Sequence, residues 1–165
     1  MNWEVIGAVT EIIGVLAVVL TLVYLAVQVR QNNELLRSES RQALVSNDVV
    51  SLTSNLGHAD VINKYVSGGE LSSEDQLRLS FMFAIDLRNR EFEYFQYTNG
   101  LLDEESWLTY RNVILINHST ELGRKWWGEI GREFVDPEFA RQVDELLVNA
   151  EPINIYERMA TWAKT

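Results

Sequence analysis

The sequence predicts an all-α protein, in which an N-terminal transmembrane helix continues into a cytoplasmic antiparallel helical bundle. Three observations predict this fold. Residues 5 to 29 form an apolar run whose only charged residue is Glu11. Beyond this run, apolar residues recur at helical spacing, and no strand-like alternation is sustained. The sequence holds only two prolines, and their scarcity favours long helices.

The apolar run is long enough to cross a lipid bilayer. About 20 helical residues, at roughly 1.5 Å each, cross a hydrocarbon core of about 30 Å. The buried core helix of a globular protein is usually shorter. A cleaved signal peptide needs a basic start and a shorter apolar region, whereas this chain starts Met-Asn-Trp-Glu. We therefore expect residues 1–29 to be a retained membrane anchor in contact with lipid.

The charges that flank the apolar run predict its orientation. Arg30, Arg37 and Arg41 follow the run closely, and no Lys or Arg precedes it. The positive-inside rule then places the C-terminal body in the cytoplasm and the N-terminus outside. In a Gram-negative bacterium this is the topology of an inner-membrane protein.

Polar residues and glycines collect on one side of the predicted helix. At 100° per residue, they lie within an arc of about 120°. Their spacing alternates between three and four residues, which is the coiled-coil period. We call this row the polar seam, and its members are Glu4, Gly7, Glu11, Gly14, Val18, Thr21, Leu25 and Gln28.

The polar seam predicts a contact between helices. Lipid tails do not solvate a carboxylate, so Glu11 should face a partner rather than lipid. Small residues such as Gly7 and Gly14 let two helices approach closely. With a single predicted span, the partner is expected to be another chain, most simply a copy of the same chain. A closed homo-oligomer would place its Glu11 side chains in a ring.

Three interpretations of the polar seam remain open. In the first, the seam is packed, and Glu11 fixes the register of neighbouring helices through a proton or a hydrogen bond. In the second, the seam lines a cation-conducting pore, in which the Glu11 ring attracts cations and Thr21 and Gln28 line the path further in. In the third, the chain is an accessory subunit that docks on a larger membrane transporter or enzyme complex. In the first and third interpretations, the expected role of the chain is structural or interaction-based.

The start of the chain has a distinctive pattern, made up of Trp3-Glu4, Ile6-Gly7, Glu11-Ile12-Ile13-Gly14 and the stretch from Thr21 to Asn32. This pattern resembles the start of a family of small, uncharacterised bacterial single-span membrane proteins. The resemblance covers about the first 35 residues and extends more loosely to Trp126-Trp127 and the helix after them. It implies a retained N-terminal span and a helical body, and it carries no catalytic role.

The remaining chain predicts a juxtamembrane helix over 30–57 and a helical body over 58–165. Glycines and capping residues mark the ends of the helices. Asp136-Pro137-Glu138, for example, combines a cap, a proline at the first helical position and an acid in the first turn. The expected body helices are 59–66, Ser72 or Ser73 to Thr98, Asp103 to Asn117, Ser119 to about Gly131, Asp136 to before Pro152, and a last amphipathic stretch through Ile153, Ile155, Tyr156, Met159 and Trp162.

Composition argues against several classes of function. The net charge of −10 disfavours nucleic acid, which binds to clustered Lys and Arg. The absence of cysteine excludes disulfides and thiolate metal sites. Neither histidine follows a Glu by three residues, as di-iron bundles require, and no phosphate-binding glycine loop is present. We expect no catalytic residue, no metal and no cofactor, and therefore no enzyme.

For a few side chains in the body, the sequence predicts specific contacts. Arg88 and Arg90, with Glu91 and Glu93, are expected to form ion pairs on the surface or between helices. His118 lies at a helix junction, where its side chain is expected to cap a helix or bond the backbone. The two large rings of Trp126-Trp127 predict a place in the core, with a subunit interface as the alternative.

Overall fold

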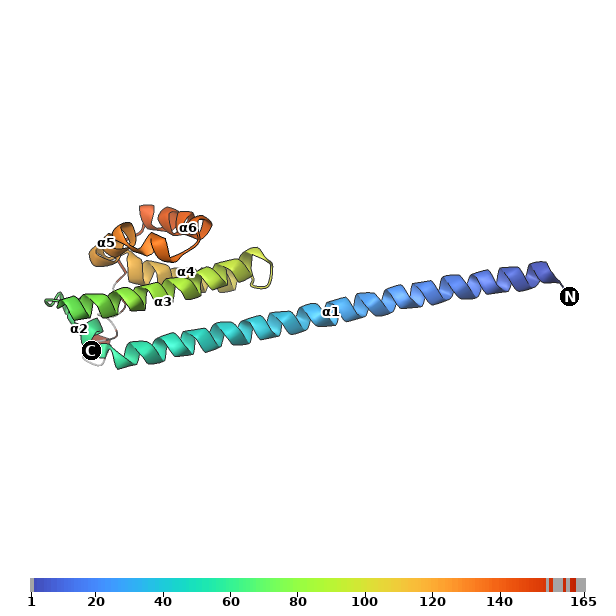
Figure 1. Cartoon of the computed structure of the whole chain (residues 1–165), viewed down its shortest axis with the longest axis horizontal. Coiled ribbons are helices and arrows are strands. Elements are labelled where there is room, and N and C mark those ends of the chain that lie inside the picture. Colours follow the sequence, from blue (N-terminus) through green and yellow to red (C-terminus); the bar gives the residue numbers. More distant parts are fainter. Residues whose placement is uncertain (1, 154, 156–158, 160, 163–165) are drawn as a thin grey trace. The chain divides into compact units, whose positions relative to one another are not determined.

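A computed structural model describes residues 2–153, 155, 159, 161 and 162, and within them every regular element is a helix (Figure 1). The all-α prediction is confirmed. The elements are α1 (Trp3–Gly57), α2 (Ala59–Ser67), α3 (Ser73–Thr98), α4 (Glu104–His118), α5 (Glu121–Glu129), the 3-10 helix η1 (Gly131–Phe134) and α6 (Pro137–Val148).

The chain divides into two compact units. Unit 1 is Met1–Glu39 and contains the first part of α1. Unit 2 is Ser40–Thr165 and contains the last part of α1 together with α2 to α6. The predicted boundary at residue 29 lies inside α1, and the one at residue 57 coincides with the end of α1.

Unit 1 is helical over its described residues and has almost no covered side chains. From residue 2 to 39, Gln28 is the one described side chain that is even half-buried. In the described chain, α1 is the one helix long and apolar enough to cross a membrane, and none of its apolar window is buried by protein. The length and composition that the sequence predicted for a spanning helix are therefore present.

Local sequence explains where α1 ends. No Gly or Pro occurs from Val15 to Leu56, so nothing in that stretch interrupts the helical hydrogen bonds. The helix ends at Gly57, as predicted. His58 follows in a turn before α2.

The predicted starts and stops of α2, α3, α4 and α6 are confirmed to within a residue or two. Gly68 and Gly100 end their helices with φ of +68° and +72°, a left-handed conformation that glycine adopts without strain. Ser72 caps α3 by accepting a hydrogen bond from the Asp75 backbone N–H, and the Asp75 carboxylate accepts one from the Ser72 N–H in return. Asp103 and Asp136 cap α4 and α6 by accepting hydrogen bonds from the backbone N–H groups of Ser106 and Glu138.

The predicted cap of α5 is wrong by one residue. Ser119 is still αR, with φ −80° and ψ −18°, and belongs to the end of α4. Thr120 is extended, and its hydroxyl oxygen accepts a hydrogen bond from the Gly123 N–H at 3.1 Å. The Ser119 hydroxyl oxygen instead accepts a bond from the Ile153 N–H, which is 34 residues away and not foreseeable from local spacing.

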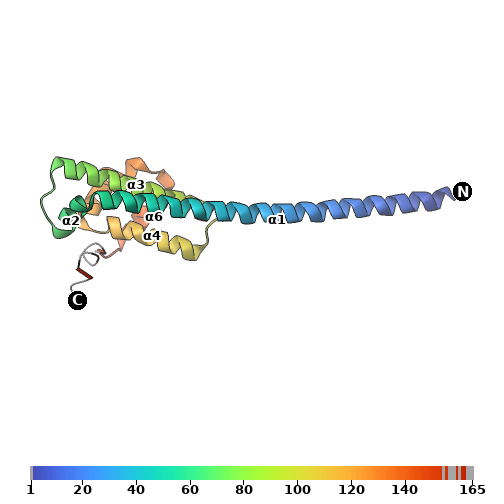
Figure 2. The ribbon, with the colours of Figure 1, turned by 90° about the horizontal axis from the view of Figure 1, so that it is seen from below.

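Unit 2 is an antiparallel helical bundle around α3. Three contacts join α1 to α3: Ser40 with Gln96, Asp48 with Arg90, and Ser51 with Asn89. Along these three contacts the residue number on α1 rises while that on α3 falls, so the two helices run antiparallel. α4 returns along α3 after the short turn at Asn99-Gly100, and α5, η1 and α6 complete the body (Figure 2).

The core of unit 2 combines aromatic and aliphatic side chains from α2 to α6. Phe83, Leu87, Ile114, Phe139 and Val143 lie at its centre and are at most 4 % exposed. The predicted amphipathic stretch after Pro152 is only partly described, and Tyr156 lies outside the described residues.

Candidate functional site

The polar seam lies on α1 within unit 1 and is open along its length. Its residues are exposed, except for the half-buried Gln28. A Cβ placed on Gly7 or Gly14 would meet nothing within 4 Å among the described residues. This chain therefore leaves the seam available to a partner.

Threonine hydroxyls on the polar side of α1 bond to their own helix. Thr10 Oγ1 donates to the Ile6 carbonyl and Thr21 Oγ1 to the Ala17 carbonyl, each at 2.8 Å. Because each proton is engaged in this way, the hydroxyl oxygens offer lone pairs rather than protons to a partner. This side of α1 therefore presents hydrogen-bond acceptors, which suit a donor from a second helix or a cation.

Side-chain pairs mark the end of the apolar run. Gln28 Nε2 donates to Gln31 Oε1 at 3.3 Å, and Arg30 Nε donates to Glu34 Oε1 at 3.2 Å. Both partners of the Arg30–Glu34 pair are exposed, so this pair adds little stability. The polar seam thus ends where the helix surface becomes charged and hydrated.

Unit 2 contains a buried charged cluster that we call the Arg90 network. It consists of Asp48 on α1 and Asp86, Arg90 and Glu93 on α3. Arg90 is ion-paired with Asp48, and its Nη2 lies 3.0 Å from Glu93 Oε1 and its Nε 3.9 Å from Asp86 Oδ1. The side chains of Arg90 and Glu93 are only 3 % and 1 % exposed, so the network lies in the interior of the bundle.

One guanidinium faces three carboxylates in the Arg90 network, and burial shifts the pKa of two of them, Asp86 and Glu93. Burial raises the pKa of Glu93 from 4.5 to about 8, while the positive charge of Arg90 acts in the opposite direction. Burial also raises the pKa of Asp86, which accepts a hydrogen bond from Asn117 Nδ2 at 2.8 Å. The Glu93 carboxyl is therefore mainly protonated at neutral pH, which reduces the excess negative charge around Arg90.

The ion-pair prediction for α3 is confirmed for Arg88, which pairs with Glu91 near the surface. Arg90 forms an ion pair between helices, but its partner there is Asp48 on α1. Sequence reasoning missed Asp48 as a partner. A signal was present, because Asp48 is the one charged residue between Arg41 and Gly57 in an otherwise polar or apolar stretch.

The expected hydrogen bond of His118 is wrong. The His118 ring is fully buried, and neither ring nitrogen has a hydrogen-bond partner in the described structure. The ring packs against Phe83 and Trp126, with centroid distances of 5.1 and 5.5 Å. Burial lowers the pKa of His118 from 6.5 to about 3, so the ring is neutral. His118 is a core residue that happens to lie beside a helix junction.

Trp126 and Trp127 both lie in the core, as the core interpretation predicted. They are 7 % and 4 % exposed, and Trp127 Nε1 donates to Asp144 Oδ1 at 2.9 Å. Little of either ring remains for contact with another subunit.

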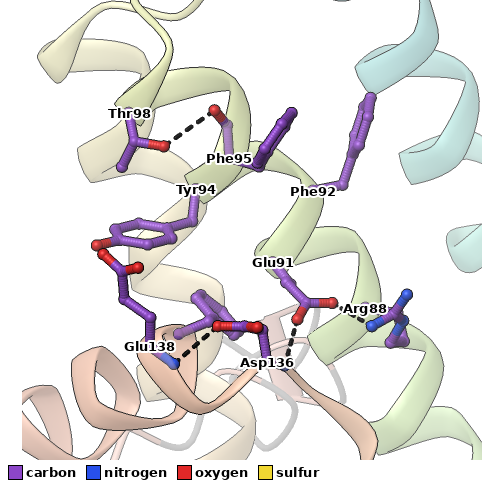
Figure 3. Close-up of a pocket in the computed structure, with 9 residues that line it drawn as sticks. Arg88, Glu91, Phe92, Tyr94, Phe95, Thr98, Asp136 and Glu138 are labelled. Atoms are coloured by element: carbon purple, nitrogen blue, oxygen red, sulfur yellow. Dashed lines mark hydrogen bonds and ion pairs between the residues drawn. The ribbon is translucent and has the colours of Figure 1, made fainter.

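An open pocket of about 400 Å³ lies between α3 and α6 (Figure 3). Glu91 in this pocket pairs with Arg88 and accepts a hydrogen bond from the Asp136 backbone N–H. Asp136 in turn accepts a bond from the Glu138 N–H and so caps α6. Glu91 and Asp136 therefore attach α6 to α3. Their hydrogen bonds are used for helix packing, which argues against a role in ligand binding.

No further support for a chemical site comes from the described residues or from known proteins. Among the described residues, no group of three or more His, Cys, Asp or Glu side chains is placed to hold a metal ion. Comparison with family models, with curated proteins and with solved structures gives no match to this chain. The resemblance of the first 35 residues to single-span bacterial proteins therefore stays a prediction.

Proposed function

We propose that this chain is a membrane-anchored protein that assembles with copies of itself through the polar seam, in a structural or interaction role rather than as an enzyme. The observation that supports this function is the open row of glycines and carboxylates on α1. That row lies on a helix long and apolar enough to cross a membrane, and no part of the apolar window is covered by the described chain.

The physics of the bilayer favours association over a lone helix. A carboxylate that faces lipid tails costs several kcal/mol near the bilayer centre, and the cost falls toward the interface. Glu11 lies about 10 Å along α1 from Glu4, at about 1.5 Å per residue. If Glu4 lies among the lipid headgroups, Glu11 therefore lies deeper, toward the lipid tails. Contact with copies of the same helix removes Glu11 from lipid and lets Gly7 and Gly14 bring the backbones together.

Assembly is tested by measuring the mass of the full-length protein in mild detergent. We expect an oligomer for the wild-type chain and a smaller species for Gly14→Leu, because the added side chain separates the helices. Ala26→Leu adds a similar side chain outside the polar arc and is the matched control, for which we expect the wild-type mass. A wild-type chain that is monomeric when purified alone would instead favour an accessory subunit of a larger membrane complex.

We further propose a bacterial inner-membrane location with the N-terminus outside and the body in the cytoplasm. The support is the cluster of Arg30, Arg37 and Arg41 directly after the apolar run. A reporter that is active only in the cytoplasm, fused after Thr165, should be active. Activity of a periplasmic reporter at the same position would reverse the proposed orientation.

A cation pore is the second candidate function, and the acceptor oxygens of α1 are the observation that favours it. A ring of Glu11 carboxylates would attract cations, and the Thr21 hydroxyl oxygens would present lone pairs to them further along the helix. Purified protein in planar bilayers should then carry a cation current that is weaker in Glu11→Gln. Absence of current across voltage, pH and membrane tension would leave the packed seam as the function of these residues.

A further inference from the structure

The part of α1 that belongs to unit 2 has a bare apolar face. Its members are spaced four, three and four residues apart, which is the heptad pattern of a helix that packs along another helix. We call this row the outer stripe, and it consists of Val45, Val49, Leu52 and Leu56, which are 54, 55, 63 and 79 % exposed.

The outer stripe is separate from the face that attaches α1 to the bundle. Ser40, Asp48 and Ser51 bond to α3, and Leu44 is buried at 1 % exposure. At 100° per residue, the centres of these two faces lie more than 90° apart around the helix. The apolar residues of the stripe therefore stay more than half exposed in the described chain.

The absence of charge distinguishes the outer stripe from an ordinary hydrated surface. Charged residues make up 23 % of the sequence, yet from Gln42 to Gly57 the one charged residue is Asp48, and it is paired with Arg90. Exposed helix surfaces normally carry charged residues, and a contiguous uncharged apolar row marks an interaction surface.

The apolar surface continues from the stripe onto neighbouring helices. A groove of about 510 Å³ is walled by Leu52 and Leu56 of α1, Ile62 of α2, and Val113 and Ile116 of α4. Ile155 and Met159 of the C-terminal stretch also line it. A helix that lies along the outer stripe would therefore find apolar side chains beside it as well as beneath it.

We propose that the outer stripe is a second self-association surface, which pairs in parallel with the outer stripe of a second copy of this chain. The proposal rests on the proposed membrane anchoring and assembly. Copies anchored in one membrane share direction and depth, so each residue meets its own equivalent at the same height. An apolar stripe is complementary to itself under that condition, whereas a charged one would place like charges together.

The charge of the chain favours this partner. Because each chain carries a net charge of −10, copies repel one another over most of their surface, and the uncharged stripe is where close approach costs least.

Cysteine crosslinking of the full-length protein in membranes tests the proposal directly. The natural chain has no cysteine, so each variant carries one thiol. Val49→Cys should give a disulfide-linked dimer under mild oxidation, because a parallel pair places the two thiols at one height. Val50→Cys is the matched control: Val50 is 64 % exposed but lies about 100° away around the helix, and it should crosslink several-fold less.

A third variant separates failure of the stripe from failure of the assembly. Val18→Cys reports contact at the polar seam. Crosslinks at position 18 without crosslinks at position 49 would overturn the outer stripe and leave the assembly intact, whereas absence of both would overturn the two proposals together. Equal crosslinking at positions 49 and 50 would indicate random collision and would also overturn the stripe.

Charge substitution distinguishes a second copy from the chain's own C-terminal stretch as occupant. Val49→Glu should lower the crosslinking of a second reporter, Leu56→Cys, several-fold and leave the melting temperature of the body unchanged, with Val50→Glu as the control. A fall in melting temperature at constant protein mass would mean that the stripe is covered within one chain, and the proposal would be overturned.

Discussion

At the scale of single residues, Glu93 and His118 are buried titratable groups that make the stability of unit 2 depend on pH in opposite directions. The pKa of Glu93 is raised from 4.5 to about 8, so the folded state holds a proton that the unfolded state releases between these values. Stability therefore falls as the pH rises from 4.5 to 8, by at most about 1.4 kcal/mol per pH unit. The pKa of His118 is lowered from 6.5 to about 3, so its contribution falls as the pH drops below 6.5.

These opposing effects predict a specific profile. The two contributions oppose each other between pH 4.5 and 6.5, and above pH 6.5 that of Glu93 is no longer opposed by His118. The raised pKa of Asp86 acts with the same sign as that of Glu93. Glu93→Gln mimics the protonated carboxyl, so it should reduce the loss of thermal stability between pH 6.5 and 8. Melting temperatures of the full-length protein in detergent at several pH values measure this. An unchanged slope in Glu93→Gln would show that Glu93 does not hold the proton.

At the scale of elements, the junction of α4 and α5 depends on a glycine. A Cβ on Gly123 would lie 2.3 Å from the Asn117 carbonyl oxygen and 2.8 Å from the His118 Cα, both of which are backbone atoms. The Thr120 cap needs this close approach, because its hydroxyl oxygen accepts the Gly123 N–H. The backbone must therefore move if any side chain is present at residue 123.

Gly123→Ala should thus lower the free energy of unfolding by more than about 2 kcal/mol, in the range of overpacked sites. Gly128→Ala is the control in the same helix, since its Cβ would meet nothing within 4 Å. It should raise stability by up to about 1 kcal/mol, because alanine is the better helix former. Denaturant unfolding of both variants measures the difference, and equal effects would contradict the tight junction.

At the scale of the whole molecule, net charge and apolar association oppose each other. A chain with a net charge of −10 repels its copies. Added salt screens this repulsion, and at about 0.1 M ionic strength the screening length is about 10 Å. Self-association of the full-length protein in detergent should therefore strengthen as the salt concentration rises. Analytical ultracentrifugation at low and high salt measures this effect. Association that weakens with salt would indicate that ion pairs, rather than apolar faces, hold the copies together.

Much of the fold could be predicted because its signals are local. Gly57, Gly68-Gly69, Asn99-Gly100 and Asp136-Pro137 fix helix ends through backbone conformation and capping, which depend on a few adjacent residues. The exposed apolar face of α1 beyond Ser40 could not be predicted in the same way. Leu44 and Val45 are adjacent apolar residues, and only the packing of the bundle shows that Leu44 is buried while Val45 stays exposed.

Sequence alone determined that the chain is all-helical, that α1 carries an apolar run of membrane-spanning length, and that polar residues and glycines share one side of it. Periodicity and local capping suffice for these features. Tertiary structure decided that Asp48 pairs with Arg90, that His118 is a neutral core ring, and that Thr120 rather than Ser119 caps α5. Those outcomes depend on contacts between residues distant in sequence, where burial rather than spacing sets the energy.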